Sequence, residues 1–151
     1  MWVTENLFKL IDDCTFLSGN IIYLTDLENV RYVRHSTSSE NINLPISRKL
    51  LQVFLNFSFT DMDSNYCLLN GKENIVPIYE DSSLNIDWSS QIILPLYADD
   101  TFYGSLISVN YHKEFNKQHL EFAKTTQAFV EKHLLNILNE HWREKNENNE
   151  E

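Results

Sequence analysis

Hydrophobic and polar positions follow a clear order between residues 91 and 109. Residues 91–97 alternate with the period-2 pattern of a strand, and residues 104–109 form a second apolar run of strand length. Between them lies the turn Ala98-Asp99-Asp100-Thr101, where aspartate side chains can hydrogen-bond to nearby backbone. This stretch therefore predicts a β-hairpin.

Shorter apolar runs predict further strands. Residues 21–25 and 30–34 have the composition of two strands joined by a turn, and residues 66–69 form a short strand ended by Asn70-Gly71. The polar stretches between the apolar runs predict loops over residues 36–43, 60–65 and 80–90.

Apolar residues at helical spacing predict three helices, over residues 5–13, 45–57 and 116–142. Thr4 can cap the first helix, because its hydroxyl can accept a bond from a free backbone N–H. Pro45 suits the opening turn of the second helix, where a missing N–H costs nothing.

The predicted element order is α-β-β-α-β-β-β-α. It indicates an α+β fold, in which a central antiparallel sheet carries the N- and C-terminal helices on one face. We expect a single domain over residues 1–142. Residues 143–151 are polar and acidic, and we expect them to form a disordered tail.

The last predicted helix carries two apolar stripes, whereas a helix on the surface of a monomer needs only one. The second stripe contains Phe122, Phe129, Leu138 and Trp142. The first has near-heptad spacing and contains Leu120, Ala123, Val130, Leu134 and Ile137. Two stripes predict that one packs on the sheet and the other on a second helix, either the chain's own first helix or that of a partner subunit.

We assign the Leu120 stripe to a homodimer interface. Val130→Glu combined with Leu134→Glu is then expected to yield a folded monomer, because both changes would place charge in the interface alone. Loss of folding would instead place this stripe against the sheet.

The chain has 151 residues, of which 42% are hydrophobic and 13% aromatic, as expected for one folded domain. Its formal net charge of −10 disfavours direct nucleic-acid binding, which relies on Lys and Arg to neutralise phosphates. No apolar run is long enough to span a membrane, and the N-terminus lacks the pattern of a signal peptide. We therefore expect a cytoplasmic protein.

Residues able to carry chemistry are present but form no recognisable motif. Cys14 and Cys67 lie far apart outside any CxxC pair, and the five histidines make no HxxxH or HExxH. Asp99 and Asp100 are expected to serve the hairpin turn. We therefore expect no catalytic residue, no metal site and no cofactor, and we interpret both cysteines as reduced and buried.

The hairpin and the helix that follows it resemble a GAF domain. In that family an apolar strand with a proline precedes an acidic or glycine-containing turn, a strand with a glycine, and a closing helix. Here the parts are IILPLYADD, FYGSLISV and EFNKQHLEFAKTTQAFVEKHL, with Pro95, Gly104, Phe115, Leu120 and Ala123 at the recurrent positions. The compact form is most similar to GAF-like regulatory domains of sporulation regulators. Element order alone also fits a PAS-like relative.

The resemblance implies a ligand site between the sheet and the segments that cover its open face. By element order this cover is residues 36–59 and 80–90. Arg48 would anchor an anionic group. The candidate lining residues are Tyr23, Arg48, Phe54, Tyr79 and Trp88. The alternative is that these aromatic side chains are plain core.

Three functions remain open from the sequence. The first is a non-catalytic sensor or regulatory domain, homodimeric, that signals to a protein partner, with a link to transcription or sporulation. The second is a protein-interaction module whose pocket is filled by its own aromatic residues. The third, ranked last, is a redox enzyme using Cys14 or Cys67. The cysteine trio of methionine-sulfoxide-reducing GAF enzymes and the Asn-Lys-Phe-Asp-Glu set of cyclic-nucleotide GAF domains are both missing.

Overall fold

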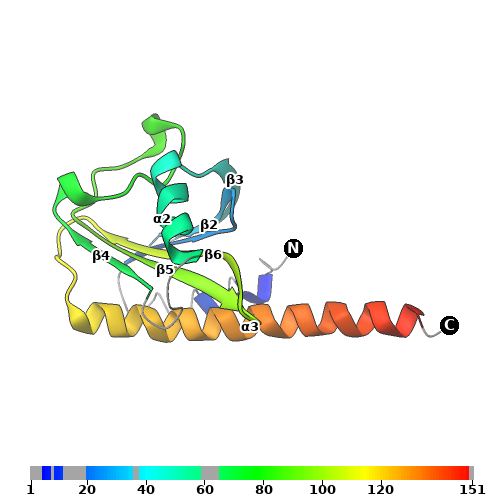
Figure 1. Cartoon of the computed structure of the whole chain (residues 1–151). Coiled ribbons are helices and arrows are strands. Elements are labelled where there is room, and N and C mark those ends of the chain that lie inside the picture. The colour runs from blue at the N-terminus through cyan, green and yellow to red at the C-terminus, as the bar shows by residue number, and fades with distance from the viewer. Residues whose placement is uncertain (1–4, 8, 12–19, 36–37, 59–64, 150–151) are drawn as a thin grey trace.

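A computed structural model describes residues 5–7, 9–11, 20–35, 38–58 and 65–149 of the chain. Six strands form one antiparallel sheet in the order β3-β2-β1-β6-β5-β4 (Figure 1). The strands are β1 (Ile21–Thr25), β2 (Asn29–Arg34), β3 (Ser39–Pro45), β4 (Cys67–Asn70), β5 (Ser90–Ala98) and β6 (Thr101–Asn110). The helices are α2 (Arg48–Ser58), α3 (Lys117–Asn149) and the short 3-10 helices η2 (Lys72–Asn74) and η3 (Ser82–Leu84).

The predicted hairpin is confirmed as β5 and β6, which pair along their whole length and close at Ala98 and Thr101. Asp99 and Asp100 form the turn with positive φ angles of 52° and 62°. Such angles match the right-handed twist of the two strands, and aspartate tolerates them better than most residues. The acidic pair therefore has a backbone role, as the sequence predicted.

Pro95 lies where β5 has become an edge strand, because the last residue of β5 that pairs with β4 is Ile93. Two side chains of α3 replace the missing strand at this edge. The Gln127 amide donates to the Pro95 carbonyl at 2.6 Å, and the Tyr97 N–H donates to the Glu131 carboxylate at 2.7 Å. Burial raises the pKa of Glu131, and the bond from Tyr97 partly offsets this by lowering it.

Three predicted boundaries were wrong. Part of the loop expected over residues 36–43 belongs to β3, whose mostly exposed side chains left no apolar alternation to detect. The second helix begins at Arg48, because Ser47 caps it by accepting the Leu50 N–H at 3.0 Å. Helix α3 continues to Asn149, past its expected end at Trp142. The predicted cap Thr4 and the predicted loop residues 60–64 lie outside the described residues.

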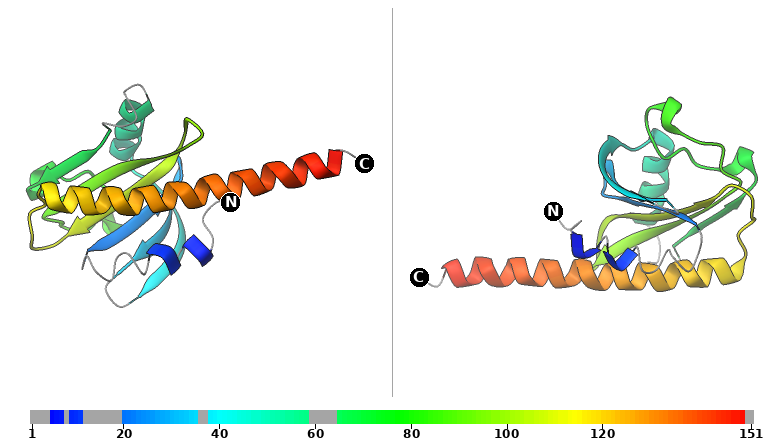
Figure 2. Two further views of the ribbon diagram at one scale, coloured as in Figure 1. Left: turned by 90° about the horizontal axis from the view of Figure 1, so that it is seen from below. Right: turned by 180° about the vertical axis from the view of Figure 1, so that it is seen from behind.

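The sheet is buried on both faces. The first core combines α3 and the N-terminal helical residues Leu7 and Ile11 with strand residues such as Leu94 and Leu106. As predicted, the terminal helical segments share this face (Figures 1 and 2). The second core lies on the opposite face, where α2 and the segment between β4 and β5 cover the sheet.

The Leu120 stripe packs inside the chain and is not a free dimer surface. Leu120, Ala123, Val130 and Leu134 are buried in the first core, and Ile137 is half-buried. The assignment of these five residues to a homodimer interface is therefore corrected. Heptad spacing defines which side of a helix is apolar, but the sheet and a partner helix can both cover such a side.

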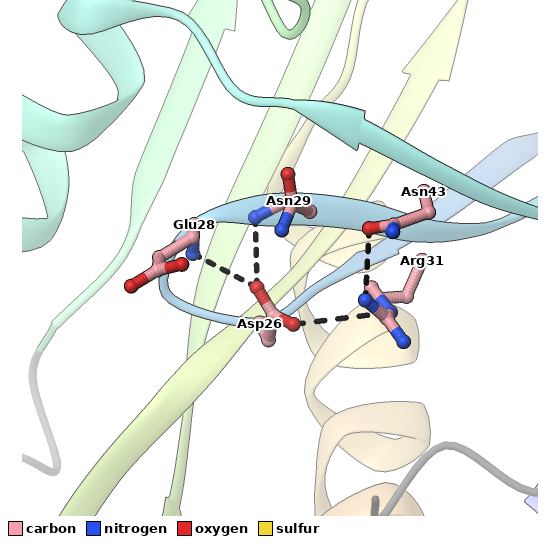
Figure 3. Close-up of polar contacts among 5 residues, drawn as sticks. All are labelled: Asp26, Glu28, Asn29, Arg31 and Asn43. Atoms are coloured by element: carbon pink, nitrogen blue, oxygen red, sulfur yellow. Dashed lines mark hydrogen bonds and ion pairs between the residues drawn. The ribbon is translucent and has the colours of Figure 1, made fainter.

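The predicted turn between β1 and β2 is organised by Asp26 (Figure 3). One carboxylate oxygen accepts the N–H groups of Glu28 and Asn29 at 2.8 and 2.7 Å, and the other lies 3.8 Å from Arg31 Nε. Arg31 also donates to Asn43 of β3 at 2.8 Å. These bonds hold the turn in one position and tie it to the edge strand.

Candidate ligand-binding site

Four of the five predicted site residues meet in the second core. Tyr23, Phe54, Tyr79 and Trp88 are all buried there. The Tyr23 ring packs edge-on against Tyr79 at 6.0 Å between centroids and against Trp88 at 6.4 Å. Phe54 instead packs on Phe102 at 5.3 Å. Arg48 is exposed at the start of α2.

Tyr111 completes the aromatic cluster of Tyr23, Tyr79, Trp88 and Tyr111. Its ring lies 4.4 Å from that of Trp88. It follows the end of β6, and nothing in the local pattern of residues 110–113 separates it from an ordinary exposed tyrosine. The register of β6 against β1 and β5 brings it to Trp88, so only the sheet could reveal it.

The buried phenols of Tyr23 and Tyr79 stay protonated. Burial raises the pKa of Tyr79 to about 12, with a smaller contribution from the negative charge of Glu40. Burial also raises the pKa of Tyr23 well above its usual value, and the neighbouring Tyr79 and Tyr111 add to the rise. At neutral pH these side chains therefore provide neutral hydroxyl groups and aromatic faces.

The segment between β4 and β5, residues 71–89, covers the cluster and is held by side-chain amides. The Gln91 amide pairs with the backbone of Val76 as a strand would, accepting at 2.8 Å and donating at 3.0 Å. Asn85 accepts the N–H groups of Ile78 and Tyr79 and donates to the Tyr79 carbonyl at 2.9 Å. The cover is thus fixed without regular secondary structure over most of its length.

The same segment is joined to the start of α2. Ser47 N–H donates to the Ile78 carbonyl at 2.8 Å, and its hydroxyl donates to the Pro77 carbonyl. Glu80 N–H donates to the Pro45 carbonyl at 3.0 Å. Helix α2 and the cover therefore act as one layer over the second face of the sheet.

A groove of about 340 Å³ opens in this layer, with the Trp88 indole as part of its wall. Its volume is at the lower end of the range for small-molecule sites, about 300–1,000 Å³. The walls combine apolar and polar surface in similar amounts and include one basic and one acidic side chain. The lining residues are Lys72, Ile75, Val76, Pro77, Ile78, Ser82, Asn85, Ile86, Asp87 and Trp88. The groove can hold a small molecule with an apolar body and a charged group.

Cysteine reactivity and metal binding were the other kinds of chemistry considered from the sequence. Burial raises the pKa of the Cys67 thiol, which makes the reactive thiolate scarcer at neutral pH. Cys14 lies outside the described residues. Within the described part of the chain, no three His, Cys, Asp or Glu side chains gather as a metal site would require. Among the helices described, none combines the length and the apolar character of a membrane span.

No family model and no curated protein matches the sequence. The structure, in contrast, resembles solved GAF domains. It aligns with the GAF domain of a sensor histidine kinase from Bacillus halodurans at a TM-score of 0.55 and 14% identity, covering 93% of this chain and 99% of that one. The cofactor-binding GAF domain of the nutrient sensor CodY from Clostridium difficile gives 0.52 and 15%, covering 82% and 80%.

Free methionine-R-sulfoxide reductase from Neisseria meningitidis also aligns, at a TM-score of 0.54 and 16% identity, covering 89% of this chain and 78% of that one. At these identities the likenesses show a shared fold. The predicted GAF-like α+β fold is therefore confirmed. The finer resemblance to the C-terminal domain of stage V sporulation protein T has no support among them and stays a prediction.

Gln91→Leu tests how firmly the cover is held. Gln91 is fully buried, so the change leaves the N–H and C=O of Val76 without partners inside the protein. We expect the free energy of unfolding to fall by about 2–3 kcal/mol. Urea denaturation measures this loss. Asn74→Ala, which removes an exposed bond to the Asn70 carbonyl, is the control and is expected to cost under about 1 kcal/mol. Equal effects would contradict a structural role for the buried amide.

Proposed function

We propose that this chain is a non-catalytic regulatory domain that binds a small molecule in the groove beside Trp88 and signals to a protein partner. The observation that carries the proposal is the groove itself, which has both apolar and charged lining residues and is fixed by hydrogen bonds to the side-chain amides of Gln91 and Asn85. A site fixed before binding loses little conformational entropy when the ligand enters. Likeness to GAF domains of a nutrient sensor and a sensor kinase supports the same class.

The ligand we expect has an apolar body and a charged group. Lys72 borders the groove and replaces Arg48 as the proposed anchor for an anion, while Asp87 offers a partner for a cationic group. Ile75, Ile86 and the Trp88 indole would contact the apolar part. A compound that carries both charges matches this lining better than a purely hydrophobic one.

Signalling would pass through a homodimer to another protein in the cytoplasm. The net charge of −10 supports a protein partner over nucleic acid. A ligand changes such a surface only if it binds one arrangement of the domain better than another. The partner would then be a protein that acts in transcription or in sporulation.

One observation favours the interaction module as the second candidate. The Tyr23 ring packs on both Tyr79 and Trp88, and all three side chains are buried, so they occupy space between the sheet and its cover. In that case the groove stays empty and the outer surface of the cover is the functional part. Ligand binding separates the two candidates.

Trp88 provides the test. In a Trp2→Phe/Trp142→Phe protein it is the sole tryptophan, and its emission reports on the groove. A panel of charged metabolites with apolar bodies is screened by this emission and by thermal unfolding. We expect one of them to change both, with a stabilisation of about 2.7 kcal/mol at 100 times its Kd.

Matched glutamate substitutions locate the binding. Ile86 lines the groove and Leu84 does not, although their side chains are similarly exposed, at 44% and 39%. Ile86→Glu is expected to abolish the ligand response, and Leu84→Glu to leave it intact. A panel without any response, or equal loss in both variants, would favour the interaction module.

A further inference from the structure

Helix α3 is longer than the sheet on which it packs. Its 33 residues span about 50 Å at the rise of an α-helix, whereas the ten residues of β6 span about 33 Å. Between Lys117 and Glu144, the part of α3 whose burial is described, Leu134 is the last fully buried residue. The C-terminal part therefore projects beyond the domain (Figures 1 and 2). We call residues 135–149 the projecting segment.

A groove of about 530 Å³ lies where the projecting segment leaves the β5–β6 hairpin. Tyr103 forms its wall on the hairpin side, and Leu135, Leu138 and Trp142 form its wall on the helix side. Trp142 is 63% exposed and Leu135 is 38% exposed. A large apolar groove with an exposed tryptophan at its end has the composition of a protein-binding site.

The charges around this groove are self-complementary. The hairpin tip carries Asp99, which lines the groove, and the exposed Asp100 beside it. Arg143 is exposed and directly follows Trp142 on the projecting segment. A tryptophan entering the groove of another copy would carry an arginine toward two aspartates.

We propose that the occupant of this groove is the projecting segment of a second copy of the chain. The two segments lie antiparallel across a two-fold axis, and each Trp142 enters the groove between Tyr103 and Leu138 of the other copy. Arg143 then faces Asp99 and Asp100 of that copy. This specifies the homodimer of the proposed function, but it does not depend on any ligand.

The proposed dimer satisfies the requirements of a two-fold interface and leaves the Leu120 stripe on its own sheet. A two-fold interface needs one surface that contains both the inserting group and its receptor, and Trp142 and the groove lie on the same surface. Antiparallel helices also place opposite ends of their dipoles together. The buried side of α3 stays on its own sheet throughout.

Light scattering on a sizing column, at about 50 μM, tests the proposal. We expect the wild-type chain at twice its 17.8 kDa mass and Trp142→Glu at 17.8 kDa, with an unchanged circular dichroism spectrum. Phe129→Glu is the control, since Phe129 is 49% exposed on α3 and does not line the groove. It is expected to stay dimeric. A monomeric wild type, or a Trp142→Glu dimer, would overturn the proposal.

Charge reversal and cross-linking test the antiparallel geometry. Asp99→Arg is expected to weaken the dimer at least tenfold, and Asp99→Arg/Arg143→Asp to restore it. With Trp142 opposite Leu138, the two-fold axis passes at the level of residue 140, and the adjacent Asn139 is the nearest residue that lines the groove. In a chain whose Cys14 and Cys67 are serine, Asn139→Cys should therefore form a disulfide-linked dimer and Phe129→Cys should not. Failure of the rescue, or cross-linking at Phe129 alone, would overturn the arrangement.

The ligand test and the dimer test can fail separately. Trp142→Glu leaves the groove beside Trp88 untouched, so its ligand response is expected to persist in the monomer. If the dimer test fails, the proposed ligand site is not contradicted. If no ligand is found, the proposed interface is not contradicted.

Discussion

Gly104→Ala is expected to lower the free energy of unfolding by about 3 kcal/mol or more, which is enough to unfold a marginal domain. A Cβ atom at this position would lie 2.0 Å from the Thr25 carbonyl oxygen and 2.9 Å from the Asp26 Cα. Both are backbone atoms and cannot rotate away. The φ of 157° adds strain for any residue with a Cβ.

The surroundings of Gly104 cannot shift to make room. Thr25 is fully buried and shares a 2.7 Å hydrogen bond with the hydroxyl of Ser105, next to the glycine. Asp26 is held by the N–H groups of the turn (Figure 3). Moving β1 away from β6 would break the Thr25–Ser105 bond and the pairing of the two strands at this point, and the rigid turn prevents Asp26 from moving alone.

Gly71→Ala is the matched control in urea unfolding. Gly71 also has a positive φ, of 93°, but an added Cβ would meet only the flexible carboxylate of Glu73, at 2.9 Å. Its cost is therefore set by backbone strain, about 1–2 kcal/mol. A Gly104→Ala protein as stable as Gly71→Ala would show that β1 and β6 can separate, and would contradict the close approach of the two backbones as the reason for this glycine.

Val130→Glu and Leu134→Glu are each expected to prevent folding, in contrast to the folded monomer that the sequence predicted. Both side chains are fully buried between α3 and the sheet. An unpaired carboxylate placed there would cost about 4 kcal/mol or more, even if it becomes protonated. Circular dichroism and thermal melting of each single variant measure the loss.

Phe129→Glu, on the same helix, is the control that distinguishes the effect of burying a carboxylate from any effect of glutamate on the helix itself. Its side chain is 49% exposed, so the same change should shift the free energy of unfolding by under about 0.5 kcal/mol. A folded, monomeric Val130→Glu protein would restore the Leu120 stripe as a dimer interface and remove the basis for the projecting-segment dimer.

The elements that the sequence could predict are those with a local signal. The hairpin was found because alternating apolar residues flank an acidic turn, and both features lie within 20 residues of chain. The sequence pattern does not reveal strand β3, because its side chains are mostly exposed and backbone pairing with β2 sets its position. Hydrogen bonds between backbone groups do not require particular side chains, so they produce no recognisable alternation in the sequence.

The candidate site shows the same division. Tyr23, Tyr79 and Trp88 could be selected because large aromatic residues stand out beside the predicted cover, and the structure brings them together. Tyr111 and Gln91 could not be selected. Their roles depend on which residue of β6 lies beside Trp88, and on the approach of Val76 to β5.

Local patterns in the sequence are sufficient for the fold class, the hairpin and its acidic turn. The reason for a glycine at position 104 is tertiary, because it is the backbone of Thr25 and Asp26 that approaches this residue. What each apolar surface contacts depends on how the elements pack. A stripe on a helix requires burial but does not name its partner. The sheet covers Leu134, and the C-terminal part of α3 extends past the sheet because the helix is longer than the strands beneath it (Figure 1).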